Sequence, residues 1–121
     1  SSDLKTESWI SKMNEECNNN DISFWLVMHP YEMQVNERGI KKWSKKSIKI
    51  PKNVLDFDTF KEMERFSEDC KFKLFNVLPA LRNYNGDPDD LYLKDDYGHY
   101  NVIGNKIVAD QLANQLLYFF N

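Results

Sequence analysis

The sequence predicts an α/β fold in which helices cover both faces of a parallel sheet. Two short apolar runs, at residues 22–29 and 72–78, have the length and composition of buried strands. Three longer segments, at residues 4–17, 58–70 and 102–120, repeat apolar residues at helical spacing. Because helices and strands alternate along the chain, we expect the strands to pair in parallel through a helical crossover.

The first predicted helix covers residues 4–17. Its apolar residues recur at intervals of three and four: Trp9, Ile10, Met13 and Cys17. Such spacing is typical of an amphipathic helix, and Asp3 is a suitable N-cap because its side chain can accept from free backbone amides. The run Asn18-Asn19-Asn20 is expected to end this helix.

The first predicted strand, residues 22–29, is nearly continuous in apolar residues, as in strands that are buried on both faces. Pro30 cannot donate to a central ladder, so the strand is expected to end at His29. In open α/β sheets the ligand crevice lies at the carboxyl ends of the strands. The residues expected at this rim are His29, Tyr31, Glu32 and Gln34.

Residues 35–54 lack a clear period and are rich in lysine. Five lysines surround Trp43: Lys41, Lys42, Lys45, Lys46 and Lys49. One interpretation is a solvated loop or short helix whose Trp43 packs against the body of the protein. The other is a cationic lid for an anionic substrate.

The second predicted helix covers residues 58–70, with Asp58 as its cap. Its apolar stripe consists of Phe60, Met63, Phe66 and Cys70. The second strand, FKLFNVL at residues 72–78, follows at once and is expected to stop at Pro79.

The final helix, residues 102–120, carries a long apolar stripe and has Asn101 as its expected cap. Gly104 falls in its first turn, where glycine costs about 1 kcal/mol relative to alanine. We therefore expect a neighbouring stretch of backbone to approach Gly104 closely.

Asp96 and His99 lie three residues apart on the loop that leads into the final helix. A general base needs an imidazole whose Nδ1–H is held by a carboxylate, so that Nε2 is free to accept a proton. The intervening Gly98 allows the Asp96 carboxylate to fold back onto His99. The spacing therefore predicts a carboxylate–imidazole pair.

The block LYLKDDYGHYNVIGNKIVA, residues 91–109, resembles the last sequence block of the SGNH, or GDSL, hydrolase family. In that family an Asp and a His three residues apart are followed by Asn, Gly and an apolar helix. The segment LVMHPYEMQV, residues 26–35, is similar to the edge of the fourth strand in bacterial members. The resemblance implies the C-terminal part of a three-layer, flavodoxin-like parallel sheet with helices on both faces.

The resemblance also implies a serine esterase, deacylase or O-acyltransferase with a Ser–His–Asp triad. Transferred to this sequence, His99 is the general base and Asp96 its orienting partner. The substrate would be an acyl ester, with acetylated carbohydrate among the candidates. Many members act outside the cell or in the cell envelope. Asn101 and Gly104 match the block as a helix cap and a packing position.

The Gly-Asp-Ser nucleophile block of the family is absent from the sequence, and so are recognisable oxyanion donors. Ser1 and Ser2 stand too close to the first strand to replace that block. We therefore expect residues 1–121 to be a single domain or the C-terminal fragment of an SGNH-like domain. On this expectation the missing N-terminal part supplies the serine, and the fragment alone is inactive.

Composition excludes several other classes of protein. The 121 residues suit one domain, and a formal net charge of −3 disfavours nucleic-acid binding. No stretch is apolar enough for a membrane span. We expect no cofactor and no metal site, because the acidic run lacks an EF-hand frame and Cys17 and Cys70 lack zinc-ligand spacing.

The alternative function is a non-catalytic module of the same fold that binds carbohydrate or protein. Four aromatic residues could form its binding surface: Tyr31, Trp43, Tyr97 and Tyr100.

Overall fold

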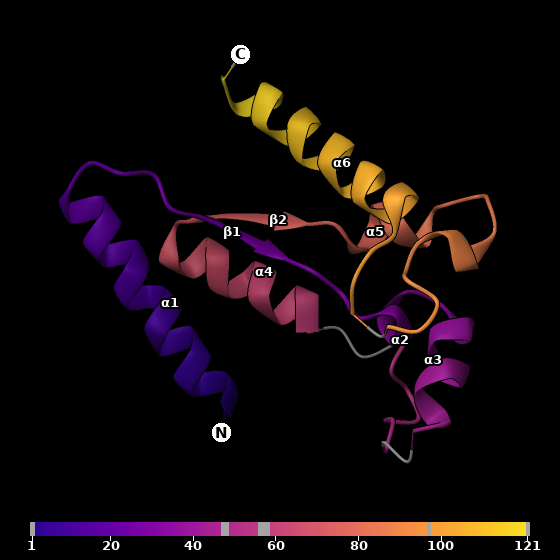
Figure 1. The fold of residues 1–121 in the computed structure, drawn as a ribbon. Helices are drawn as coiled ribbons and strands as arrows, with labels where there is room; N and C mark the ends of the chain where they lie inside the picture. Colours follow the sequence, from indigo (N-terminus) through magenta and orange to yellow (C-terminus); the bar gives the residue numbers. More distant parts are fainter. Residues whose placement is uncertain (1, 47–48, 56–58, 97, 121) are drawn as a thin grey trace. The chain divides into compact units, whose positions relative to one another are not determined.

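The computed structural model describes residues 2–46, 49–55, 59–96 and 98–120 (Figure 1). These residues form a mixed α/β structure that is mostly helical and contains a small parallel sheet of two strands. The α/β class and the parallel pairing are thus confirmed.

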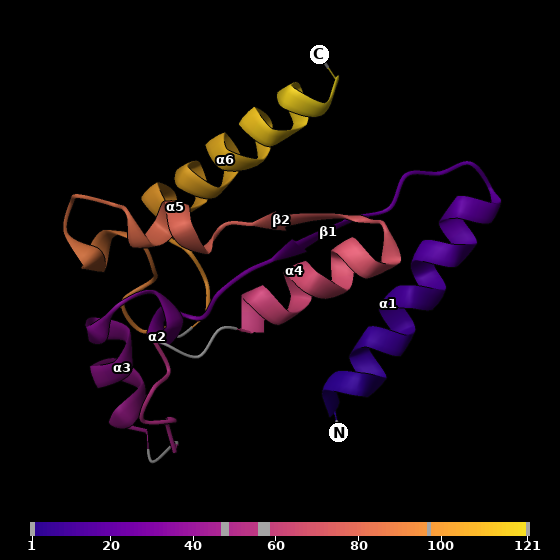
Figure 2. The ribbon, with the colours of Figure 1, turned by 180° about the vertical axis from the view of Figure 1, so that it is seen from behind.

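The chain divides into two compact units. The first consists of Ser1–Met28 and Asp58–Phe75, and the second of His29–Phe57 and Asn76–Asn121. The elements of the first unit are α1 (Ser2–Asn19), β1 (Trp25–Met28), α4 (Thr59–Cys70) and β2 (Lys73–Asn76). In Figures 1 and 2, α4 runs along the two strands.

Aromatic side chains form much of the first unit's interior. Trp25 of β1 stacks on Phe75 of β2, with ring centroids 5.0 Å apart. Phe72 meets Phe24 and Phe66 edge to face, at 5.5 and 5.7 Å. Such pairs add to the free energy gained by apolar burial, so they help to hold α4 against the strands.

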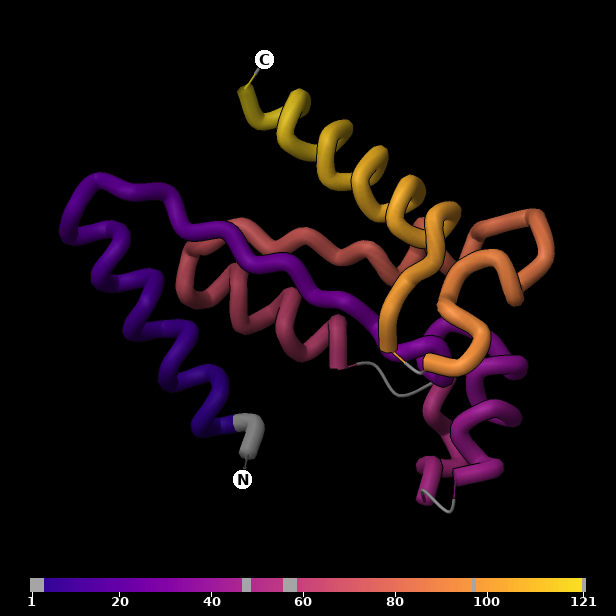
Figure 3. Tube along the Cα trace, in the orientation of Figure 1, coloured from indigo at the N-terminus to yellow at the C-terminus, as the bar shows by residue number. Residues whose placement is uncertain are grey.

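The second unit is helical, and its chain path can be followed in Figure 3. Its elements are α2 (Glu32–Val35), α3 (Glu37–Ser44), α5 (Leu78–Arg82), the 3₁₀ turn η1 (Pro88–Asp90) and α6 (Val102–Phe120). Val77, Leu81, Leu91 and Tyr92 are almost completely buried and form its core. The Arg82 guanidinium donates to the carbonyl oxygens of Gln34 and Leu55, which joins α5 to the segment around α2.

The predicted helices are present with small shifts at their ends. The final helix has the predicted bounds, and the Asn101 side chain caps it by accepting from the amides of Ile103 and Gly104. The first helix begins at Ser2, so the backbone of Asp3, the predicted cap, already lies inside it. It ends within the asparagine run. The expected cap Asp58 lies outside the described residues.

Both strands are shorter than predicted. The first spans Trp25–Met28 and is half-buried throughout, not buried on both faces. In the described two-strand sheet each strand has one unpaired edge, which leaves its backbone accessible and limits how far any of its residues is buried. The second strand ends at Asn76, and Pro79 lies in the first turn of α5. Proline is tolerated there because the first helical amides have no partner within the helix.

The lysine-rich segment contains a helix, in agreement with one of its two interpretations. Trp43 of α3 packs edge to face on Tyr31, with ring centroids 5.4 Å apart. The α2 helix was not predicted. Its single turn has no hydrophobic period, and it is stabilised by the Tyr31 amide, which donates to the side-chain oxygen Oε1 of Gln34.

None of the described helices is both long enough and apolar enough to cross a lipid bilayer. Cys17 and Cys70 are free thiols and only half-buried.

Candidate active site

The site is built on a short antiparallel pairing in the second unit. Tyr92 and Tyr100 form a β-bridge. The Leu93 amide donates to the His99 carbonyl, and the Asn101 amide donates to the Leu91 carbonyl, both at 3.0 Å. These bonds close a loop of residues 93–99, so Asp96 and His99 lie between two anchored ends.

Within this loop the Asp96 carboxylate folds back as predicted. Its Oδ1 accepts from the amides of Gly98 and His99, at 2.8 and 3.0 Å. Its Oδ2 lies 2.7 Å from His99 Nδ1. The structure therefore brings together the two residues for which the sequence predicted a pair.

The hydrogen bonds from Gly98, from the imidazole and from the His99 amide lower the pKa of Asp96 from 3.8 to about 2. Asp96 is therefore ionised at neutral pH and can only accept hydrogen bonds. In neutral His99 this leaves the proton on Nδ1 and the lone pair on Nε2. Since the side chain is 79% exposed, an incoming hydroxyl can reach Nε2.

Because its pKa is lowered in the folded state, Asp96 stabilises the fold above pH 4 and loses this contribution as the pH falls toward 2. A carboxyl-carbon NMR titration should place its midpoint near pH 2. In urea unfolding, the free energy of unfolding of Asp96→Asn should fall less steeply between pH 4 and pH 2 than that of the wild type.

The matched control is Asp95→Asn, which removes a neighbouring charge without removing the hydrogen bonds to Asp96. A midpoint near pH 4 for Asp96, or an unchanged acid slope in Asp96→Asn, would contradict the structure.

Two tyrosines at the ends of the loop contact the His29–Pro30 segment. The Tyr92 hydroxyl is buried and donates to the Pro30 carbonyl at 2.7 Å, and burial raises the pKa of Tyr92. Burial also raises the pKa of Tyr100 to about 12, and its hydroxyl lies 3.1 Å from His29 Nδ1. Both hydroxyls therefore stay protonated at neutral pH and join the His29–Pro30 segment to the loop.

An ion pair between partly buried Lys42 and buried Glu32 fixes the start of the loop. Lys42 Nζ lies 2.8 Å from Glu32 Oε2 and also donates to the Leu93 carbonyl at 2.7 Å. The Glu32 side chain is 3% exposed, so loss of Lys42 would leave a buried, unpaired carboxylate. No local pattern in the sequence links Lys42 with either partner, so this positioning role could not be predicted from sequence.

Two other residues predicted at the rim, Tyr31 and Gln34, differ in whether they lie beside the Asp96–His99 loop. Tyr31 is 52% exposed and lies near Gly98. Gln34 caps α2 and takes no part in the site. Tyr97 of the predicted aromatic surface is outside the described residues, and Tyr31 and Trp43 pack on each other.

Gly104 explains how α6 meets the loop. A Cβ atom at this position would overlap the Leu91 carbonyl oxygen, which confirms the predicted close approach of backbone. The same Leu91 carbonyl accepts from the Asn101 amide, so it contacts both the first turn of α6 and the residue that follows the loop.

Several acidic residues near the loop have protein partners. Asp87 and Asp89 pair with Arg38, and Asp90 accepts from the Tyr84 hydroxyl. Among the described residues, no three His, Cys, Asp or Glu side chains come together as a metal site.

No protein-family model, curated protein or solved structure matches this chain.

Proposed function

We propose that these residues supply the His–Asp part of the triad in an SGNH-type serine esterase, deacylase or O-acyltransferase. The observation that carries this proposal is the 2.7 Å contact between Asp96 Oδ2 and Nδ1 of an exposed His99. In this role His99 is the general base, and Asp96 holds its tautomer and stabilises the imidazolium that forms.

The nucleophilic serine belongs, in this proposal, to polypeptide outside the 121 residues. Its Oγ attacks the acyl carbonyl carbon while its proton passes to His99 Nε2. The tetrahedral intermediate collapses, the C–O bond to the alcohol breaks, and Nε2 returns the proton to the leaving oxygen. Water or a second alcohol then attacks the acyl-serine, with His99 again accepting and returning one proton.

The finer architecture is part of the same proposal: a three-layer, flavodoxin-like sheet to which the described two-strand sheet contributes. Parallel strands normally lie among further strands and under helices on both faces. The C-terminal half of α6 also exposes large apolar side chains, among them Leu117, Tyr118 and Phe120. Such a surface supports an additional packed layer.

The test uses the full-length protein in which these residues occur. A fluorophosphonate probe should modify one serine, identified by peptide mass spectrometry, and block hydrolysis of p-nitrophenyl acetate. Acetylated carbohydrate is then tested as a substrate. A folded protein that neither reacts with the probe nor hydrolyses any acyl ester would overturn the proposal and favour the carbohydrate- or protein-binding alternative.

A further inference from the structure

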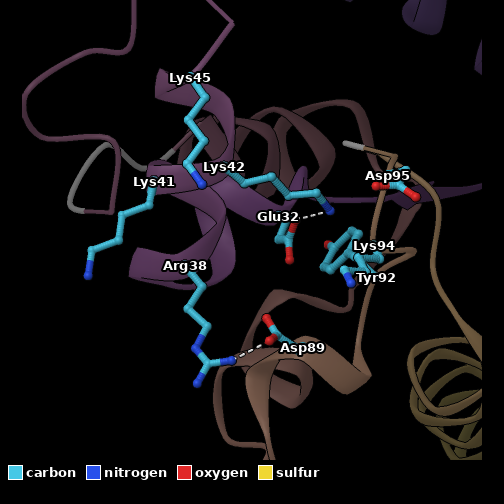
Figure 4. Close-up of a pocket in the computed structure, with 9 residues that line it drawn as sticks. All are labelled: Glu32, Arg38, Lys41, Lys42, Lys45, Asp89, Tyr92, Lys94 and Asp95. Carbon is cyan, nitrogen blue, oxygen red and sulfur yellow. Dashed lines mark hydrogen bonds and ion pairs between the residues drawn. The ribbon is translucent and has the colours of Figure 1, made fainter.

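The second unit contains a pocket of about 670 Å³ between α3 and the chain that leads into the Asp96–His99 loop (Figure 4). One wall is the cationic side of α3. The opposite wall includes Tyr92, Lys94 and Asp95. The α3 residues that line the pocket are Arg38, Lys41, Lys42 and Lys45. Pockets of this volume commonly hold small organic ligands.

Positive charge exceeds negative charge in this pocket, although the whole chain has a net charge of −3. Five cationic side chains face three carboxylates. Glu32 pairs with Lys42, and Asp89 with Arg38, as the dashed lines in Figure 4 show. The remaining cations are Lys41, Lys45 and Lys94, which form no ion pair among the described residues.

The pocket and the loop share structural supports. Lys42 lines the pocket and also holds the Leu93 carbonyl at the start of the loop. Lys94 and Asp95 belong to the loop itself and directly precede Asp96. A ligand in the pocket therefore lies beside the segment that carries His99.

We propose that this pocket binds the oxyanion of an acidic sugar, either a carboxylate or a phosphate. The lining carries two more cationic than anionic side chains, Asp95 included, and among the described residues Lys45 and Lys94 form no ion pair, so they can offer charge-assisted hydrogen bonds to such a group. As a statement about the substrate, the inference rests on the proposed function: the acyl ester is carried by an acidic saccharide. Anion binding itself does not depend on catalysis.

The test compares three related sugars by NMR titration of the 121-residue chain: glucuronate, glucose 6-phosphate and neutral glucose. Glucuronate or the phosphate should shift amide signals of α3 and residues 93–95, and added salt should weaken the effect. Glucose should bind at least about ten-fold more weakly, because it lacks the charged group. The tighter of the two acidic sugars identifies the oxyanion.

The triple variant Lys41→Gln/Lys45→Gln/Lys94→Gln should lower affinity for the acidic sugar by at least about ten-fold. The matched control is Lys5→Gln/Lys49→Gln/Lys52→Gln, which changes the net charge by the same amount at exposed positions outside the pocket. Its affinity for the acidic sugar should stay within about two-fold of the wild-type value. Circular dichroism verifies that both variants fold. Equal loss in both triples, equal binding of glucose, or no binding by either acidic sugar would overturn the inference.

His99→Ala separates the two proposals, because it should retain anion binding while losing esterase activity in the full-length protein. Anion binding in a protein that lacks esterase activity would leave the pocket established and refute only the catalytic role. Ester hydrolysis by a protein that binds neither acidic sugar would support the catalytic role and refute only the anion-binding pocket.

Discussion

If the proposed function holds, replacing His99 by alanine in a protein that also carries the proposed serine should lower kcat/KM for an acyl ester by about 10³- to 10⁴-fold. In the proposed mechanism the substitution removes the group that takes the serine proton, and no other described side chain occupies its position on Asp96 Oδ2. Fold stability should hardly change, because the His99 side chain is 79% exposed. Steady-state hydrolysis of p-nitrophenyl acetate and urea unfolding measure the two effects.

Two further measurements make this prediction specific. Added imidazole should partly restore turnover to His99→Ala, because an exposed site admits the free base. Asp96→Asn should also lose activity, since an amide cannot enforce the required tautomer, whereas Asp110→Asn on the exposed side of α6 should not. If His99→Ala keeps the wild-type rate, His99 has no part in the mechanism.

Gly104→Ala should destabilise the second unit by about 3 kcal/mol, the upper part of the range for overpacked interiors. The new methyl group would overlap the Leu91 carbonyl oxygen, and a backbone atom cannot move aside as a flexible side chain can. Urea or thermal unfolding followed by circular dichroism measures the change.

The control is Gly98→Ala in the loop, where an added Cβ would lie 3.5 Å from the Tyr31 ring, an ordinary contact. It should change stability little. At an unconstrained helical position, Gly→Ala stabilises by about 1 kcal/mol. Stabilisation of this size by Gly104→Ala would show that α6 does not press against Leu91.

The sequence pattern predicts a helix correctly where the helix is long enough to show an apolar repeat and contains or adjoins its own cap. The α6 helix has the predicted bounds, because its apolar repeat is long and Asn101 supplies a local cap. The sequence pattern did not predict α2 and α5, which are only one or two turns long. Helices of that length have too few residues to display a period, and their neighbours stabilise them.

The strands illustrate the same limit. Their apolar runs predicted the right locations, but the ends depend on pairing. Lys73 can pair with Phe24, whereas Leu78 starts a helix whose first turn accepts a proline. Composition alone does not distinguish these outcomes, because both segments are apolar.

The contact between Asp96 and His99 could be predicted from sequence alone, because three residues of chain with Gly98 between them bring the two groups together locally. The support of that loop by Lys42 depends on tertiary structure. Lys42 is separated from Glu32 by 10 positions and from Leu93 by 51, so only the folded chain brings these groups within hydrogen-bonding distance. The cationic pocket likewise required the fold, since Lys94 joins the lysines of α3 only when the loop packs beside that helix.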